Sequence, residues 1–251
     1  GHMQVRLGPM RVGPHGILQP IADGLKLFFK EDILPANADK PVFYVAPVIS
    51  LIAALSSLAV IPFFEKGVVA NINIGLLFIL AMSSLGSYGI ILAGWSSNSK
   101  YSFLGGLRSA AQVISYEIAM GLSLVGVMML AGSLNLTDIV KAQQNYPFSM
   151  FLIPQFIGCF VFTLSAIAET NRSPFDLPEA ESELVAGYFV EYSGMRFALF
   201  FAAEYCAMII MASVGIVCFL GGWNPPLPIL AIPYVPFAWF FMKLYVLIFI
   251  Y

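Results

Sequence analysis

Histidine, cysteine and charged residues are all scarce in this sequence. It has 2 histidines, 3 cysteines and only 10% charged residues. The histidines, His2 and His15, both lie near the start, which excludes a redox centre held by histidine ligands. Cys159, Cys206 and Cys218 have neither CxxC nor Cys/His spacing and lie in apolar segments, so they are interpreted as small packing residues. No iron–sulfur cluster, haem or zinc site is therefore predicted.

Several catalytic and binding motifs are also missing. The sequence has no Walker loop, no GxGxxG and no Ser/His/Asp arrangement. The formal net charge of -2, without a basic cluster, argues against binding to nucleic acid or another polyanion. No catalytic residue is therefore assigned from a motif.

Apolar residues, by contrast, are abundant. They make up 59% of the chain and give a mean hydropathy of +0.86, which is typical of membrane proteins. We therefore predict an all-α fold, a polytopic transmembrane helical bundle that forms a single integral membrane domain over residues 1–251. Six segments are each near the ~20 residues needed to cross a bilayer core: Val42–Phe64, Ile72–Trp95, Ala110–Leu130, Phe148–Ala168, Phe197–Leu220 and Ile229–Tyr251.

Lysines and arginines outside these segments gather on one face of the membrane. If the six helices alternate in direction, the N-terminal segment 1–41 and the loops after the second and fourth spans share that face. Only Lys66 and Lys141 fall on the opposite face. Because positive residues are retained on the cytoplasmic side, the three loops are predicted to face the cytoplasm or the mitochondrial matrix.

The N-terminal segment has the pattern of an amphipathic helix. Pro14 and Gly16 are expected to start this helix and Pro35 to stop it. It is too short and too charged to span, so a helix lying along the membrane surface is favoured over one packed wholly against protein. Its apolar residues recur at helical spacing and its polar residues fall on another face. The apolar residues are Ile17, Ile21, Leu25, Phe28 and Phe29, and the polar residues are Gln19, Asp23, Lys26 and Lys30.

A dense acidic block follows the fourth predicted span and forms the predicted cytoplasmic loop 169–196. Between Glu169 and Glu191 its only base is Arg172. Acids packed this closely repel one another, so part of the block is expected to ionise with difficulty and to carry protons. The alternative is a solvated loop whose charges only keep it in water. The block contains six of the 14 acidic residues of the chain: Glu169, Asp176, Glu179, Glu181, Glu183 and Glu191.

Few charged residues lie inside the predicted spans. They are Glu117 in the third, Glu204 in the fifth and Lys243 in the sixth, with Glu169 at the cytoplasmic end of the fourth. A carboxyl group at the bilayer centre costs about 2.5 to 3.5 kcal/mol even on the most lenient scale, so such residues usually face a cavity or a partner. Glu117 and Glu204 are therefore predicted to be functional. Lys243 is interpreted as a side chain that reaches an acidic partner or an interface.

Four stretches with many polar residues resemble a known family, the H subunit of bacterial respiratory complex I and its mitochondrial counterpart. Chance similarity between hydrophobic segments would not give polar matches of this length. The matching stretches are Arg6–Asp32 (RLGPMRVGPHGILQPIADGLKLFFKED), Lys100–Leu122 (KYSFLGGLRSAAQVISYEIAMGL), Ala168–Tyr205 (AETNRSPFDLPEAESELVAGYFVEYSGMRFALFFAAEY) and Phe219–Trp223 (FLGGW).

The resemblance implies eight transmembrane helices, of which six are visible here. The chain begins where the first family helix should just have finished, and it stops in or near the seventh. The sequence is therefore expected to be partial, or those regions not to have been included. The first residues, Gly1 to Met3, fit the family's residues before the arginine loop better than a cloning scar.

The resemblance also implies a function at the joint between the peripheral and membrane arms of NADH:quinone oxidoreductase. There the subunit forms the entrance and much of the membrane-side wall of the quinone chamber and couples quinone reduction to proton translocation. The substrate is ubiquinone or menaquinone, and no cofactor is bound covalently. FMN and the iron–sulfur clusters belong to partner subunits, so this chain has no redox centre. The implied partners are the quinone-site subunits of the peripheral arm, small membrane subunits, antiporter-like subunits and the lipid bilayer.

Individual residues take their expected roles from this resemblance. An arginine fork suits a nearby carboxylate, so Arg172 and Asp176 are expected to form an ion pair that braces the acidic loop. Glu117, Glu169 and Glu204 match the intramembrane acids of the proton path. The quinone-chamber residues are Arg6, Arg11, Leu25, Phe28, Arg172, Asp176, Glu179, Glu181, Glu183 and Glu191.

Two other functions are weighed against complex I. One is the equivalent membrane anchor subunit of a membrane-bound hydrogenase or formate hydrogenlyase, and retention of the whole acidic block and of the first arginine loop favours complex I over it. The other is an autonomous transporter or channel, which the absence of internal repeats disfavours. The expected location is the bacterial inner membrane, with the mitochondrial inner membrane as the alternative.

Overall fold

A computed structural model describes residues 8–65, 67–144, 150–172, 174–177, 185, 187–225 and 236–250. Each of the six predicted spans contains a helix, and the described residues include no strand, which confirms the all-α fold. The six helices are α2 (Lys40–Leu58), α3 (Gly75–Ser96), α4 (Lys100–Ala131), α6 (Phe156–Glu169), α8 (Gly194–Cys218) and α9 (Pro236–Ile250). The shorter elements are η1 (Pro14–Gly16), α1 (Gln19–Phe29), α5 (Leu136–Gln143) and η3 (Gly187–Phe189).

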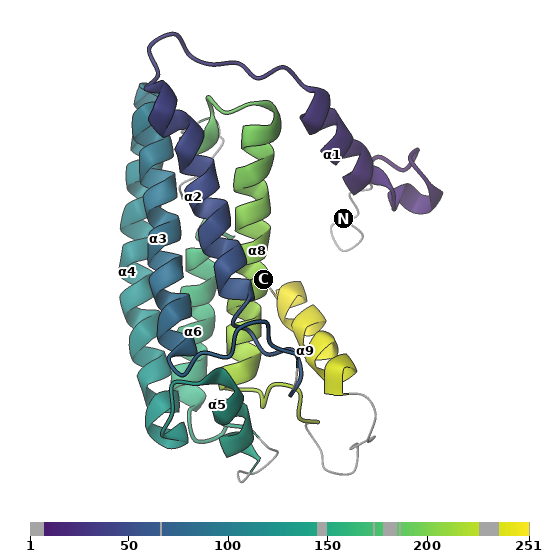
Figure 1. The fold of residues 1–251 in the computed structure, drawn as a ribbon, viewed down its shortest axis with the longest axis vertical. Coiled ribbons are helices and arrows are strands. Elements are labelled where there is room, and N and C mark those ends of the chain that lie inside the picture. The colour runs from purple at the N-terminus through teal and green to yellow at the C-terminus, as the bar shows by residue number, and fades with distance from the viewer. Residues whose placement is uncertain are drawn as a thin grey trace.

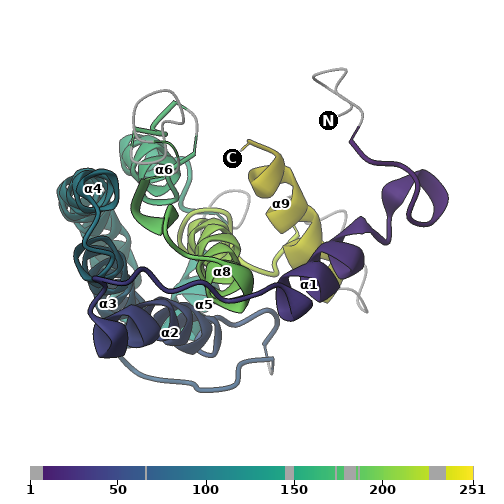
Figure 2. The same cartoon turned by 90° about the horizontal axis from the view of Figure 1, so that it is seen from above.

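Five of these helices form a ring. Helix α3 packs between α2 and α4, α6 packs on α4, and α8 packs on α2 and meets α6. Viewed from above in Figure 2, the five surround a common centre, with α1 and α9 outside. The starts of α2, α4 and α8 and the end of α3 lie at the top of Figure 1. We call this the acidic-loop end, because the segment between α6 and α8 connects there.

The helices differ in length from the predicted spans. Helices α2, α3, α4 and α8 are long and apolar enough to cross a membrane. Helix α6 has only 14 residues because it begins at Phe156 after the turns that contain Pro154, later than the predicted start at Phe148. Helix α4 has 32 residues and begins at Lys100, ten positions before the predicted Ala110. At 1.5 Å per residue it is about 48 Å long, so it extends beyond a ~30 Å hydrocarbon core.

Glycine lets α4 approach its neighbours closely at the acidic-loop end. A Cβ atom on Gly94 of α3 would lie 2.8 Å from the carbonyl oxygen of Ser102 in α4. One on Gly105 of α4 would lie 2.7 Å from the Cα of Gly187 in η3. Small residues of this kind allow helix backbones to pack closely in membranes, where apolar side chains gain little from mutual contact. The acidic-loop end is therefore packed backbone against backbone.

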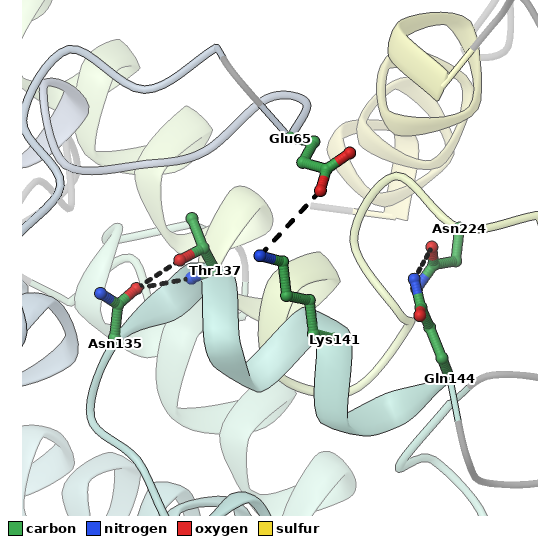
Figure 3. Close-up of polar contacts among 6 residues, drawn as sticks. All are labelled: Glu65, Asn135, Thr137, Lys141, Gln144 and Asn224. Atoms are coloured by element: carbon green, nitrogen blue, oxygen red, sulfur yellow. Dashed lines mark hydrogen bonds and ion pairs between the residues drawn. The ribbon is translucent and has the colours of Figure 1, made fainter.

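Polar side chains fix the opposite end of the bundle. In Figure 3, Asn135 caps α5 by accepting from the backbone N–H of Thr137 at 2.9 Å, and Lys141 lies 4.0 Å from Glu65. Lys243 of α9 donates to the carbonyl oxygens of Leu220, Gly222 and Asn224 at 2.6 to 2.9 Å. Lys243 is thus structural, as interpreted from the sequence, but its partners are backbone carbonyls that follow α8.

Helix α1 lies outside the bundle. It has no buried residue, and the apolar side chains of Leu25 and Phe28 are 56% and 66% exposed. The helix ends at Phe29, because Lys30 already has an extended backbone, and Pro35 lies five residues further on. The predicted amphipathic helix is therefore present but shorter than expected. Within this chain it is not packed wholly against protein.

Two alanine substitutions in α4 test whether the acidic-loop end depends on close backbone contact. Gly105→Ala is expected to lower the stability of the assembled complex by about 1–3 kcal/mol, because backbone atoms of η3 leave no room for a methyl group. Gly121→Ala is the matched control, since within the described ranges no atom apart from its chain neighbours and its own helix backbone lies within 4 Å of its Cβ position. Thermal melting of the two purified variants measures the difference. Equal melting temperatures would contradict the close-contact explanation.

Candidate functional site

A cavity lies inside the helix ring and holds about 750 Å³ of empty space, part of it open to the outside. Residues from α2, α3, α4, α6 and α8 line it. Its walls are mostly apolar, but two carboxyl groups, Glu169 of α6 and Glu204 of α8, face it. Serine hydroxyls lie on its α2 and α3 sides. They belong to Ser50, Ser57, Ser83 and Ser87.

Two adjacent serines of α3 join two of the three predicted intramembrane acids. The hydroxyl of Ser83 donates to Oε1 of Glu169, and the hydroxyl of Ser84 donates to Oε1 of Glu117 at 2.8 Å. The second carboxyl oxygen of Glu169 is buried and has no hydrogen-bond partner among the described residues. Carboxyl and hydroxyl groups both accept and donate protons. Glu117, on α4, and Glu169, on α6, thus each accept a hydrogen bond from the same turn of α3.

The third acid pairs with the acidic loop. Nη2 of Arg172 lies 3.1 Å from Oε1 of Glu204, whose side chain is 12% exposed. The Arg172 guanidinium also lies 5.3 Å from the ring centre of Tyr205. The prediction of an ion pair between Arg172 and Asp176 is therefore wrong. Arg172 pairs with a carboxylate of α8 instead, and the side chain of Asp176 is exposed. Sequence proximity favoured Asp176, but the fold brings Glu204 closer.

Helix α4 holds the first part of the acidic loop through one buried amide. The side-chain nitrogen of Gln112 donates to the carbonyl oxygens of Ala168 and Phe175 at 2.7 and 2.8 Å. It also lies 3.3 Å from the side-chain oxygen of Asn171. Asn171 has a left-handed backbone (φ 51°), which asparagine tolerates better than most residues, and the chain turns sharply there. Gln112 thus fixes the turn that aims Arg172 at Glu204.

The last part of the loop is held by α4 as well. Ser102, which is fully buried, donates to the carbonyl oxygen of Tyr188 at 2.8 Å. Tyr192 then stacks on Phe43 of α2 with ring centres 4.0 Å apart, and burial raises the pKa of Tyr192 to about 12. Its hydroxyl lies 3.3 Å from that of Ser96 and stays protonated at neutral pH. Both described ends of the loop therefore rest on the bundle.

The sequence prediction did not single out Gln112 or Ser102. The available signal was a polar side chain inside an apolar helix, which needs a hydrogen-bond partner when it is buried. Arg196 was also missed, because it was counted only for the membrane topology. It is buried at the start of α8 and forms an ion pair with Asp32.

The remaining predicted residues do not line the cavity among the described residues, or they fall outside the described ranges. Glu191 is half-buried, and Arg11 is exposed in the segment before η1. Leu25 and Phe28 lie on the exposed face of α1. Within the described ranges, no cluster of three or more His, Cys, Asp or Glu residues could hold a metal ion. The predicted chamber residues outside the described ranges are Arg6, Glu179, Glu181 and Glu183.

Comparison with known proteins identifies the family. A family model described as NADH dehydrogenase matches residues 1–251. The H subunit of NADH-quinone oxidoreductase from Rhodospirillum rubrum is 55% identical over 252 residues, which cover 100% of this chain and 74% of that protein. The H subunits from Magnetococcus marinus and Rickettsia bellii are 54% and 56% identical, each over 99% of this chain and over 71% and 74% of their own lengths. The chain therefore belongs to the family of H subunits of NADH-quinone oxidoreductase, and is a multi-pass membrane component of that enzyme complex.

Proposed function

We propose that this chain forms the entrance channel and part of the wall of a quinone chamber, and that it couples quinone reduction to proton translocation. The observation that carries the proposal is the Arg172–Glu204 pair, which joins the acidic loop to a carboxyl group in the cavity wall. The names of the relatives support a quinone substrate. Ubiquinone and menaquinone would both fit this proposal.

The coupling proposal follows from the order of the charged groups. Quinone reduction at the acidic loop draws protons or creates negative charge near Arg172. A new negative charge there competes with Glu204 for the guanidinium, because both interactions act in surroundings of low dielectric constant. Glu204 then responds by changing its protonation. Glu169 faces the same cavity, and adjacent serines of α3 donate to Glu169 and to Glu117, so we assign the response a route across the bundle through these groups.

The entrance proposal rests on α1. Its exposed apolar face would lie in the interfacial layer of the bilayer, where an isoprenoid tail can slide from lipid toward the protein. The start of α8, which directly follows the acidic loop, adjoins the last turn of α1. A tail held along α1 would therefore place the quinone head near the loop.

The remaining parts of the proposal concern the assembly. Lysines and arginines gather at the acidic-loop end, so we propose that this end faces the bacterial cytoplasm and that the chain lies in the inner membrane. Partner subunits would carry FMN and the iron–sulfur clusters. The peripheral arm would dock at the acidic-loop end, and the small membrane and antiporter-like subunits would pack beside the bundle. No observation favours the hydrogenase, formate hydrogenlyase, transporter or channel alternatives.

The first prediction from this proposal concerns the acidic loop. Asp176→Asn is expected to lower quinone reductase activity about tenfold, because the proposal assigns this exposed carboxylate of the acidic loop to the chamber wall. Electron transfer from NADH to an artificial acceptor should stay unchanged in the same purified complex. Asp138→Asn at the opposite end of the bundle is the control. An equal loss of both activities in a fully assembled complex would contradict the chamber role.

The second prediction concerns the entrance. Leu25→Gln and Phe28→Gln should each raise the apparent KM for long-tailed quinones about threefold or more, and leave short-tailed analogues nearly unaffected, because tail binding depends on apolar area removed from water. Lys26→Gln, on the polar face of α1, is the matched control. Steady-state kinetics with both quinone classes measure the effect. Equal changes for long and short tails would show that α1 is not the entrance.

The third prediction concerns coupling. Glu204→Gln keeps size and hydrogen bonding but cannot titrate, so proton pumping and quinone turnover should fall together, by about tenfold. Glu65→Gln, an exposed glutamate at the opposite end, is the control. The measurements are NADH-driven pumping and turnover in reconstituted vesicles. A wild-type ratio of protons per NADH at a wild-type rate in the Glu117→Gln, Glu204→Gln double variant would refute the coupling role.

A further inference from the structure

The start of α8 holds the chain that leaves α1. Three residues there, Ser193, Gly194 and Arg196, contact the segment 30–33. The hydroxyl of Ser193 accepts from the backbone N–H of Ile33 at 2.9 Å. Nη2 of Arg196 lies 2.5 Å from Oδ2 of Asp32. This segment is thus bound to α8 by a hydrogen bond and an ion pair.

Close backbone contact adds to this attachment. Gly194 has a left-handed backbone (φ 57°), and a Cβ atom there would lie 3.1 Å from the carbonyl oxygen of Lys30. The same Cβ position lies 3.7 Å from the carbonyl oxygen of Leu27, in the last turn of α1. Glycine therefore allows the first turn of α8 to lie directly against the end of α1.

Arg196 is confined by more than its carboxylate. Its guanidinium lies 3.7 Å from the ring centre of Tyr44 and 5.3 Å from that of Phe43, both in the first turn of α2. The residue is only 7% exposed. Its Nη1 is buried without a hydrogen-bond partner among the described residues, and Asp32 is the only carboxylate paired with it there. The Asp32 side chain is 41% exposed, so solvent weakens the pair, but removal of Asp32 would still leave the buried guanidinium without its carboxylate and destabilise this contact.

Helix α1 needs such an attachment. It has no buried residue, so its own packing does not fix its position. The far part of the linker is tied separately to the end of α3, where the N–H of Asp39 donates to the carbonyl oxygen of Ser96 at 3.0 Å. Between these two points the linker crosses the acidic-loop end of the bundle (Figures 1 and 2). The position of α1 beside α8 therefore depends on its last turn and on residues 30–33, which contact the start of α8.

We propose that the Arg196–Asp32 pair is a clasp that positions α1 against α8 and so sets the geometry of the quinone entrance. Arg196 and Asp32 are positioning residues in this inference, which rests on the proposed function of α1 as the entrance helix. Arg196 of the clasp and Glu204 both belong to α8 and are eight residues apart. Helix α8 therefore carries both the attachment of the entrance helix and the carboxyl group that faces the cavity.

The test uses the assembled complex and two independent measurements. Asp32→Asn and Arg196→Met are compared with Glu31→Gln, which changes the adjacent exposed carboxylate. The first measurement is amide hydrogen exchange of Ile33, whose N–H bonds to Ser193. It should become about tenfold faster in the clasp variants and stay unchanged in the control. The second is the apparent KM for long-tailed and short-tailed quinones, of which only the first should rise, about threefold.

The outcomes separate the clasp from the entrance role. Unchanged exchange at Ile33 in Asp32→Asn would overturn the clasp, whatever the kinetics show. Faster exchange with unchanged KM for both quinone classes would overturn the entrance role of α1, and with it the functional half of this inference. The Asp32→Asn, Arg196→Met double variant should exchange no faster than Asp32→Asn alone, because no unpaired buried charge remains. Additive effects in the double variant would show that the two residues act separately.

Discussion

The ion pair between Arg172 and Glu204 connects the two parts of this molecule on which its function would depend. Arg172 belongs to the acidic loop, and Glu204 belongs to the interior of α8 and faces the cavity. Carboxyl groups inside an apolar bundle are costly, so each requires a partner. Here the partner comes from outside the bundle. The position of the loop and the charge of the cavity are therefore determined together.

The rest of the site maintains this pair. Gln112 fixes the turn at Asn171 that directs Arg172 toward Glu204. Ser102 holds the last part of the acidic loop at Tyr188. Both belong to the part of α4 near the acidic-loop end, which packs closely because Gly105 has no side chain. Helix α4 therefore acts as the platform of the loop. This explains why α4 continues well beyond the length that a bilayer requires.

Much of the fold and part of the site could be predicted from the sequence. Helices in the six apolar segments, an amphipathic N-terminal helix and three acids within the helices are all present, since hydropathy and helical periodicity depend on local composition. Helix ends were less accurate. Pro154 delayed α6, and α4 continued through a polar stretch, because helix termini depend on turns and on packing against other elements. The predicted Arg172–Asp176 pair failed for a related reason, since sequence proximity does not decide which carboxylate an arginine reaches.

The sequence by itself determined that the chain is an all-α membrane protein with one acidic loop and a few carboxyl groups in apolar spans, where they cost free energy. It also marked Lys243 as structural. Only the tertiary structure decided the partners: Glu204 for Arg172, Asp32 for Arg196, adjacent serines of α3 for Glu169 and Glu117, and three backbone carbonyls for Lys243. The physical reason is that a charged side chain within an apolar helix needs a partner, and the sequence shows which side chains these are. The identity of that partner depends on which helices pack together and on their rotation.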